Sequence, residues 1–363
     1  MGTPPCDVLS AEIALELLEG ELAVELPGHM RAFARAHAEG RPPPAAPLLA
    51  RLASTLATAR DACVHDELAD RGFAMLRLVA PLVIEDDPAV TAARARPPSW
   101  PNLAELARAR DAAARLRFGR SMIELAHLLH GGAPAGATEP EPLGVPVPGW
   151  HARGPAADTA AIVDAWQAIA ARLGVSGTVR VDRSAHARPR AFIVEPQVEV
   201  VIVVPEVVDT PAARFAVLHE LGHAVAAFAI PGGLPRAVDE AAAAYVAMLA
   251  EPPSCLPPRW TSDLAGEARA RRTRLAAALD RVERALPDGG ADRGGVARAL
   301  AALGDPETPA WALWHDPGTQ AAYVAADTIA SRLRRDLGTS PPRGQLVAAL
   351  AAERDRIDRA IRL

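Results

Sequence analysis

Residues 219–223 read HELGH, so two histidines stand four residues apart and a glutamate follows the first. Residues at positions i and i+4 lie on one face of an α-helix, which lets His219 and His223 direct two imidazoles at one metal ion. Glu220 falls at the edge of that face, where it can hold a metal-bound water without ligating the metal. The segment therefore predicts a hydrolytic Zn²⁺ site in which Glu220 is the general base.

The residues around this segment predict the helix that must carry it. Thr210 is a typical N-cap residue, and Pro211 directly after it is typical of the first turn of a helix. The positions that flank the histidines are largely apolar, which favours a buried helix over residues 211–230: Phe215, Val217, Leu218, Leu221, Val225 and Phe228.

A catalytic zinc site needs a third protein ligand and one open position. A second helix is expected over residues 236–250, after a turn rich in proline and glycine at 231–235. Glu240 is the preferred third ligand, because it shares a helical stripe with small residues that suit close packing against the first helix. Asp239, one residue earlier, remains the competing candidate.

The C-terminal part of the chain concentrates rare residues that could assist hydrolysis. The chain has only two tyrosines, and one of them, Tyr323, follows His315 within eight residues. A zinc hydrolase needs hydrogen-bond donors for the developing oxyanion, and histidine and tyrosine are suitable donors. We therefore expect His315 or Tyr323 at the site, with His186 as a weaker third candidate. The pair His127 and His130 lacks a nearby acidic partner and is not expected to bind metal.

Composition narrows the classes of function. Half of the 363 residues are apolar but only 4% are aromatic, which favours closely packed, alanine-rich helices. Acidic and basic residues are mixed, with a net charge of −5, so no nucleic-acid partner is expected. The three cysteines form no C-x-x-C pair, as is typical of a reducing compartment. No signal peptide and no membrane-spanning run is visible, so no membrane partner and a cytoplasmic location are expected.

The order of patterns predicts a mainly α fold with a small β-sheet, an α+β arrangement with a zincin-like catalytic core. Residues 1–131 predict a helical N-terminal lobe, residues 132–157 a linker rich in proline and glycine, and residues 158–363 the core with C-terminal helices. Helix breaks are expected at Pro27–Gly28 and near Arg71–Gly72, and one helix over about residues 102–129. The strongest strand signals are residues 191–194 and 198–204, which are rich in β-branched residues.

Several segments resemble zinc peptidases of the gluzincin type. Residues 190–225, which run from the strands through HELGH, resemble the thimet oligopeptidase and oligopeptidase F family, and residues 238–249 (VDEAAAAYVAML) resemble the third-ligand helix of the angiotensin-converting-enzyme family. Residues 110–125 and 314–333 are similar to an N-terminal helix and to the His…Tyr segment of these peptidases. The resemblance implies a two-lobed helical fold that cleaves short peptides, with the strand at 198–204 pairing with the substrate backbone.

The resemblance assigns His219, His223 and Glu240 as zinc ligands, Glu220 as the general base, and His315 and Tyr323 as oxyanion donors. Ala244 stands where many gluzincins carry an aspartate that orients a ligand histidine, and Asp239 is the residue that could replace it. Two alternatives remain open. One is a regulatory metallopeptidase of the ImmA/IrrE type that cleaves a specific protein, and the other is a catalytically inactive helical binding protein with a vestigial zinc site.

Overall fold

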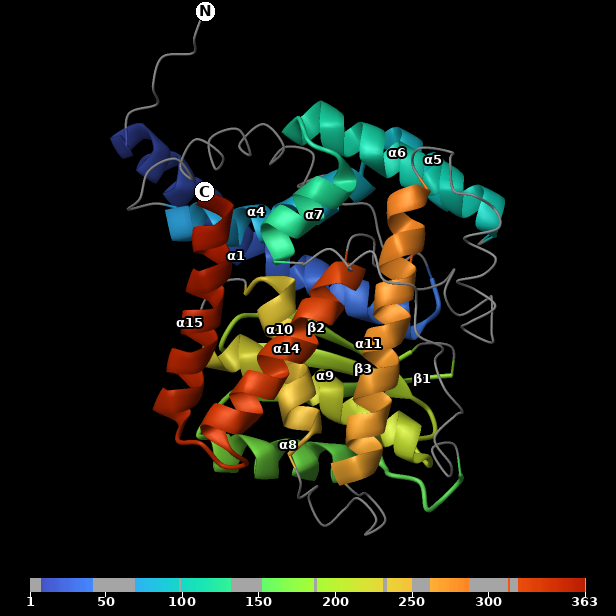
Figure 1. Ribbon diagram of the computed structural model, residues 1–363, viewed down its shortest axis with the longest axis vertical. Helices are drawn as coiled ribbons and strands as arrows, with labels where there is room; N and C mark the ends of the chain where they lie inside the picture. Colours follow the sequence, from blue (N-terminus) through green and yellow to red (C-terminus); the bar gives the residue numbers. More distant parts are fainter. Residues whose placement is uncertain are drawn as a thin grey trace, which may run out of the picture.

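The computed structural model describes residues 8–41, 69–97, 99–131, 152–185, 188–230, 234–249, 262–286, 313 and 319–362. These residues form a mainly helical molecule with one small three-stranded sheet (Figure 1). The predicted class, mainly α with a small β-sheet, is therefore confirmed. None of the helices in the described part of the chain is long and apolar enough to cross a membrane.

The described N-terminal helices are α1 (Val8–Ala38), α4 (Ala69–Glu85), α5 (Pro88–Arg94), α6 (Trp100–Phe118) and α7 (Met122–His130). The predicted break at Pro27 is wrong, because α1 continues through this residue. Leu15 near one end of α1 is buried with α4–α7, and Ala34 near the other end is buried against the sheet. These contacts at both ends hold a helix that the proline alone would weaken by about 3 kcal/mol.

Two other predicted boundaries in this region are also wrong. Helix α4 runs through Arg71 and Gly72 without interruption. The single helix expected over residues 102–129 is two helices, because Gly119 ends α6 in the left-handed conformation and Ser121 starts α7. Ser121 and Glu124 satisfy each other's backbone N–H groups in a capping box, which fixes the new start.

The sheet and the helices that follow it carry the HELGH segment. They are α8 (Thr159–Leu173), β1 (Thr178–Ser184), β2 (Arg190–Glu195), β3 (Glu199–Pro205), α9 (Pro211–Ala229) and α10 (Arg236–Ala247). The strand order is β1-β3-β2, with β1 parallel and β2 antiparallel to β3. Strand β3 is thus paired on both sides, so the expectation that residues 198–204 bind a substrate strand is wrong.

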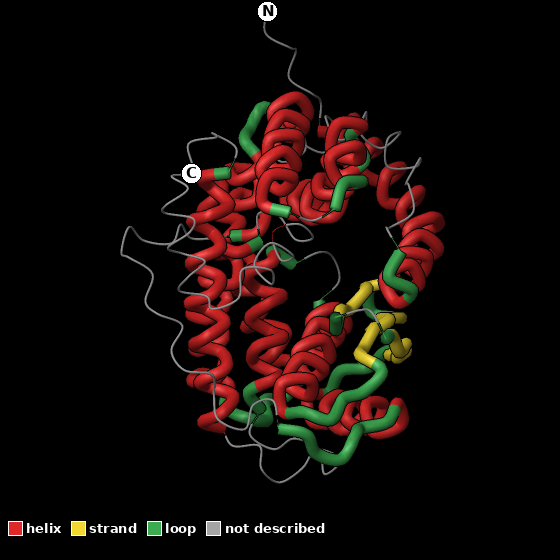
Figure 2. The backbone as a smooth tube through the Cα atoms, turned by 90° about the vertical axis from the view of Figure 1, so that its right-hand side faces the viewer, coloured by secondary structure: helices red, strands yellow, loops and turns green. Residues whose placement is uncertain are grey.

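The sheet lies between two helical layers, and the alternation of side chains along β3 shows why. Val200, Ile202 and Val204 are buried in the cluster that contains α8 and α9. Val201 and Val203 point the other way and are buried with Phe192, Val194 and Ala34 of α1. A strand buried on both faces needs apolar residues at every position, which the run at 200–204 supplies. Figure 2 shows the strands grouped at one side of the molecule.

Three C-terminal helices complete the fold: α11 (Ser262–Ala285), α14 (Gln320–Leu337) and α15 (Arg343–Arg362). Helix α14 packs against both α10 and α11, and Figure 1 shows α10 and α14 between α11 and α15. Leu279 and Val282 of α11 are buried with the N-terminal helices α4–α7. Helix α11 therefore connects the N-terminal helices with the neighbourhood of α9 and α10.

Candidate metal centre

The close contact between α9 and α10 brings the two histidines to Glu240. Thr210 caps α9 by accepting a hydrogen bond from the N–H of Ala213, as the sequence predicts. Gly222, between the histidines, faces Ala243 of α10, where an added Cβ atom would lie 2.4 Å from the Ala243 Cα atom. Only a glycine permits this approach, so the residue type at position 222 sets how near α10 can come.

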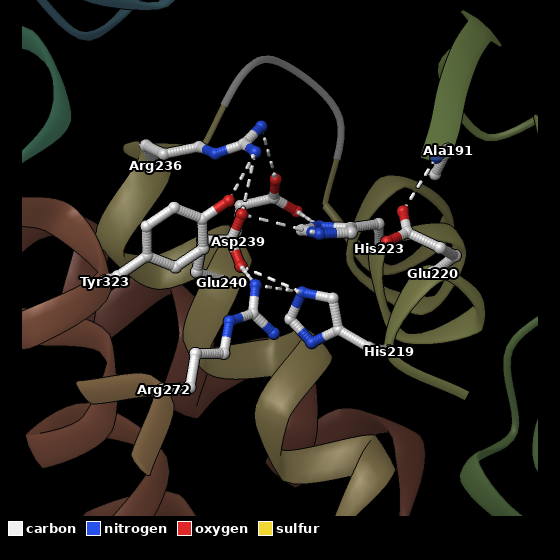
Figure 3. A network of polar contacts seen from close by, with 9 residues as sticks. All are labelled: Ala191, His219, Glu220, His223, Arg236, Asp239, Glu240, Arg272 and Tyr323. Atoms are coloured by element: carbon white, nitrogen blue, oxygen red, sulfur yellow. Dashed lines mark hydrogen bonds and ion pairs between the residues drawn. The ribbon is translucent and has the colours of Figure 1, made fainter. Parts of the chain in front are cut away.

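His219, His223 and Glu240 form a buried cluster that could hold a metal ion. One ligand atom from each lies within 4.8 Å of the others. Nε2 of His219 is 2.9 Å from Oε2 of Glu240, and Nε2 of His223 is 3.6 Å from Oε1 (Figure 3). Among the residues that the structure describes, no other group of three histidine, cysteine, aspartate or glutamate side chains is so arranged.

Asp239, the competing candidate for third ligand, lies on the other side of the His223 ring. Its Oδ1 atom is 3.0 Å from Nδ1 of His223, which leaves Nε2 directed at Glu240. Metal-binding histidines commonly donate their second N–H to a carboxylate in this way. The Nδ1 atoms of both histidines are buried, and neither meets the geometry of a hydrogen bond within the described residues. Only His223 has a carboxylate, that of Asp239, within ion-pair distance of its Nδ1 atom in the described residues.

The contacts of Nε2 of His219 test whether the cluster suits a metal. This atom is 2.9 Å from Oε2 of Glu240 and 3.1 Å from the Arg272 guanidinium. A ring nitrogen carries either a proton or a lone pair, so it cannot donate to the carboxylate and also accept from the arginine. Burial, and then Arg272, lower the pKa of His219 to about 3, which leaves a neutral ring. Two imidazole nitrogens and a carboxylate form a donor set that fits Zn²⁺.

The charged groups around the cluster shift the pKa values of His223 and Glu240 in opposite directions. Burial alone lowers the pKa of His223, but Asp239 and Glu240 together raise it to about 9. Burial favours the neutral acid at Glu240, yet Arg236 and the two histidines hold the pKa of this carboxyl well below its usual range. Glu240 is therefore an anion although its side chain is only 1% exposed.

Glu220 is not a member of the ligand cluster, and its carboxylate contacts strand β2. Its Oε2 atom accepts a hydrogen bond of 2.7 Å from the N–H of Ala191 (Figure 3). Burial raises the pKa of Glu220, so its proton-bound form is more accessible than that of an exposed glutamate. Ala191 offers this N–H from the side of β2 that does not pair with β3, so an edge of the sheet faces the HELGH segment.

Of the expected oxyanion donors, Tyr323 lies next to the cluster. Its hydroxyl oxygen accepts a hydrogen bond of 3.3 Å from Arg236, and its ring lies 4.7 Å from the guanidinium carbon of Arg272. His315 and His186 lie outside the described residues. His127 is 2.6 Å from Arg284 through Nε2.

Two arginines that the sequence analysis did not identify belong to the site. Arg236 is four residues before Glu240 on α10 and lies 2.7 Å from its Oε1 atom, a contact that the i,i+4 spacing could have indicated. Arg272 comes from α11 and lies 3.2 Å from Oε2 of Glu240. No local pattern links residues 240 and 272, so only the packing of α11 could reveal this contact.

Comparisons with known proteins do not assign a family. No protein-family model matches the sequence, and no curated protein is significantly similar to it. A solved structure described as "The Structure of CHT" aligns with 98% of this chain and 77% of its own, at 12% sequence identity and a TM-score of 0.39. A similarity this weak has no bearing on the fold or the function.

Proposed function

We propose that this protein is a zinc-dependent peptidase that hydrolyses peptide bonds of short peptides and works in the cytoplasm. The observation that carries the proposal is the buried cluster of His219, His223 and Glu240 with Glu220 directly beside it on α9. This donor set is that of hydrolytic zinc sites, which have two histidines, a glutamate and one open position. A bound zinc ion would lower the pKa of water to about 7 and polarise a carbonyl group.

Glu220 is the residue of this chain suited to move the proton. A carboxylate there can accept a proton from the attacking water and return it to the leaving amine. The pKa of Glu220 is raised by burial, which brings the carboxyl nearer to the range in which it can both accept and release a proton. Its hydrogen bond to Ala191 N–H fixes the carboxylate at β2, where His223 is an electrostatic neighbour.

Strand β2 offers a backbone edge for an extended substrate, in place of β3. Within the described sheet β2 pairs only with β3, so its other edge can bind a peptide by main-chain hydrogen bonds. Backbone groups alternate in direction along an antiparallel strand, so the groups of Ile193 point the same way as those of Ala191. A peptide on this edge would run past Glu220, and Tyr323 across the cluster would donate to the developing oxyanion.

Digestion of a mixed library of short peptides, read by mass spectrometry, tests the proposal. We expect zinc-loaded wild type to cleave peptides and Glu220→Gln to lose cleavage by about 10²–10⁴-fold while its zinc content is unchanged. Glu206→Gln, at an exposed position, is the matched control and should retain wild-type cleavage. Equal cleavage by Glu220→Gln and wild type would refute the role of Glu220. No cleavage by zinc-loaded wild type would refute the peptidase and leave a metal-binding protein.

A further inference from the structure

Strand β1 lies at the edge of the sheet opposite to β2, and within the described residues it pairs with β3 alone (Figure 1). Thr178 at its start donates its N–H to the C=O of Val198. Backbone groups alternate in direction along a strand, so every second residue of β1 from Thr178 points its N–H and C=O at β3. The intervening residues point these groups away from the sheet: Val179, Val181 and Arg183.

The two edges of the sheet differ in the length of strand that they can accept. On β2 the N–H of Ala191 is already bonded to Glu220, and the register with β3 shifts between Ile193 and Glu195. The register of β1 with β3 is continuous over all seven residues, from Thr178 to Ser184. A regular edge without a proline or a bulge is the kind that pairs with a further strand. A long partner strand therefore fits β1 better than β2.

The exposed side chains of β1 carry charges of both signs. Arg180 and Asp182 form an ion pair of 2.9 Å along the strand, and their side chains are 46% and 31% exposed. Exposed ion pairs contribute little to stability, so each charge can turn to a partner at low cost. An edge with charges of one sign would repel a second copy of itself, whereas this edge offers an arginine and an aspartate together.

Antiparallel pairing of two copies of β1 around Val181 brings the opposite charges together. The outward backbone groups of Val181 would bond to those of Val181 in the second copy, and those of Val179 to Arg183. Arg180 of each copy would lie directly opposite Asp182 of the other, in the pairs whose side chains are closest. A register moved by two residues in either direction instead puts Arg180 opposite Arg180, or Asp182 opposite Asp182. The charges therefore select one register.

We propose that β1 is the interface of a homodimer, in which two sheets join edge to edge into one continuous sheet with three strands from each copy. Two-fold symmetry is the commonest arrangement of soluble homo-oligomers, and it requires a surface that is complementary to itself. The pattern of Arg180, Val181 and Asp182 meets this requirement. The inference goes beyond the proposed function, because β2 and its contact with Glu220 lie at the other edge, which the dimer leaves uncovered.

Sedimentation velocity tests whether the chain dimerises. A single pair of strands buries less surface than a standard interface, so wild type should show a monomer–dimer equilibrium with a Kd on the order of 10–100 µM. Wild type that is still monomeric at about 1 mM would overturn the proposal.

Charge reversal tests the surface and the register. Arg180→Asp places aspartate opposite aspartate in both pairs, and Asp182→Arg places arginine opposite arginine, so each variant alone should dimerise at least tenfold more weakly than wild type. An equimolar mixture of the two variants restores opposite charges in both pairs and should dimerise as tightly as wild type. Arg335→Asp, which reverses an exposed charge of α14, is the matched control and should dimerise as wild type does.

Two outcomes of this experiment contradict the proposal. Single variants that dimerise like wild type would show that the copies meet through another surface. Variants that are folded by circular dichroism but stay monomeric when mixed would show that the paired register is wrong.

Hydrogen exchange of single amides, followed by NMR, gives a second test on the unsubstituted protein. The N–H groups of Val179, Val181 and Arg183 should exchange more slowly as the protein concentration rises, because the second copy accepts or covers them. Those of Arg180 and Asp182 point at β3 and should not respond to concentration. Exchange at Val181 that is independent of concentration, in protein that dimerises, would exclude β1 as the interface.

Discussion

At the scale of single residues, the two histidines of the cluster have opposite electrostatic surroundings. His219 is contacted by Arg272 and has a pKa of about 3, whereas His223 is contacted by Asp239 and has a pKa of about 9. His219 therefore offers a lone pair without losing a proton, and His223 must release one when a metal binds. Asp239 can keep its contact with Nδ1 of His223 in either state, which makes it the residue that orients this ring.

Replacing Asp239 by asparagine should weaken metal binding. The amide keeps the size of the side chain but removes the negative charge that supports the His223 ring. We expect the zinc affinity, measured by chelator competition, to fall by about 10–100-fold. Asp336→Asn makes the same change at an exposed residue and should leave the affinity unaltered. An unaltered affinity in Asp239→Asn would show that Asp239 does not orient the ligand.

At the scale of secondary structure elements, the contact between α9 and α10 decides whether the ligands meet. The helices themselves are predictable from the sequence, since Thr210 and Pro211 start α9 and a stripe of alanines covers α10. The order of the strands is not, because the apolar run of β3 predicts that both its faces are buried but not which strands pair with it. Pro27 likewise predicts a break in the helix, but α1 continues through it because of contacts with residues distant in sequence.

Gly222→Ala should separate α9 from α10 and weaken the metal site. The new methyl group would lie 2.4 Å from the Ala243 Cα atom, so one helix has to move. We expect a loss of about 1–3 kcal/mol in the free energy of unfolding, measured with denaturant, together with weaker zinc binding.

Gly28→Ala is the matched control for this substitution, since Gly28 also lies inside a helix but has no atom within 4 Å of the added methyl group. It should stabilise the protein by about 0.5–1 kcal/mol. If Gly222→Ala also proved stabilising and bound zinc normally, the close contact would not limit the site.

At the scale of the whole molecule, the site depends on segments that are far apart in sequence. Helix α11 supplies Arg272 to the cluster and is buried further along against α4–α7, and α14 supplies Tyr323. The motif at 219–223 and Glu240 are predictable because they lie on two consecutive helices. Arg272 is not, because its place depends on how α11 packs across the fold.

His130, at the C-terminal end of α7, should make stability depend on pH. Burial, and then Arg236 and Arg77, lower its pKa from 6.5 to about 3 in the folded protein. Between these values the unfolded chain binds a proton that the folded one does not, so stability is present above pH 6.5 and is lost as the pH falls toward 3.

His130→Leu removes this proton uptake. The free energy of unfolding of the variant should therefore fall less steeply as the pH decreases from 6.5 to 3, by up to about 1.4 kcal/mol per pH unit. Denaturant unfolding of both proteins at several pH values measures the difference. Parallel pH profiles for the two proteins would show that His130 ionises freely in the folded state.

The most direct test of the metal centre is an anomalous difference map, collected at the zinc absorption edge from crystals of the zinc-loaded protein. We expect one strong peak at about 2.0–2.2 Å from His219, His223 and Glu240, with Arg272 moved away from both Nε2 of His219 and Oε2 of Glu240. A map without a peak among these three residues, with Arg272 still on Glu240, would contradict the assignment of this cluster as a metal centre.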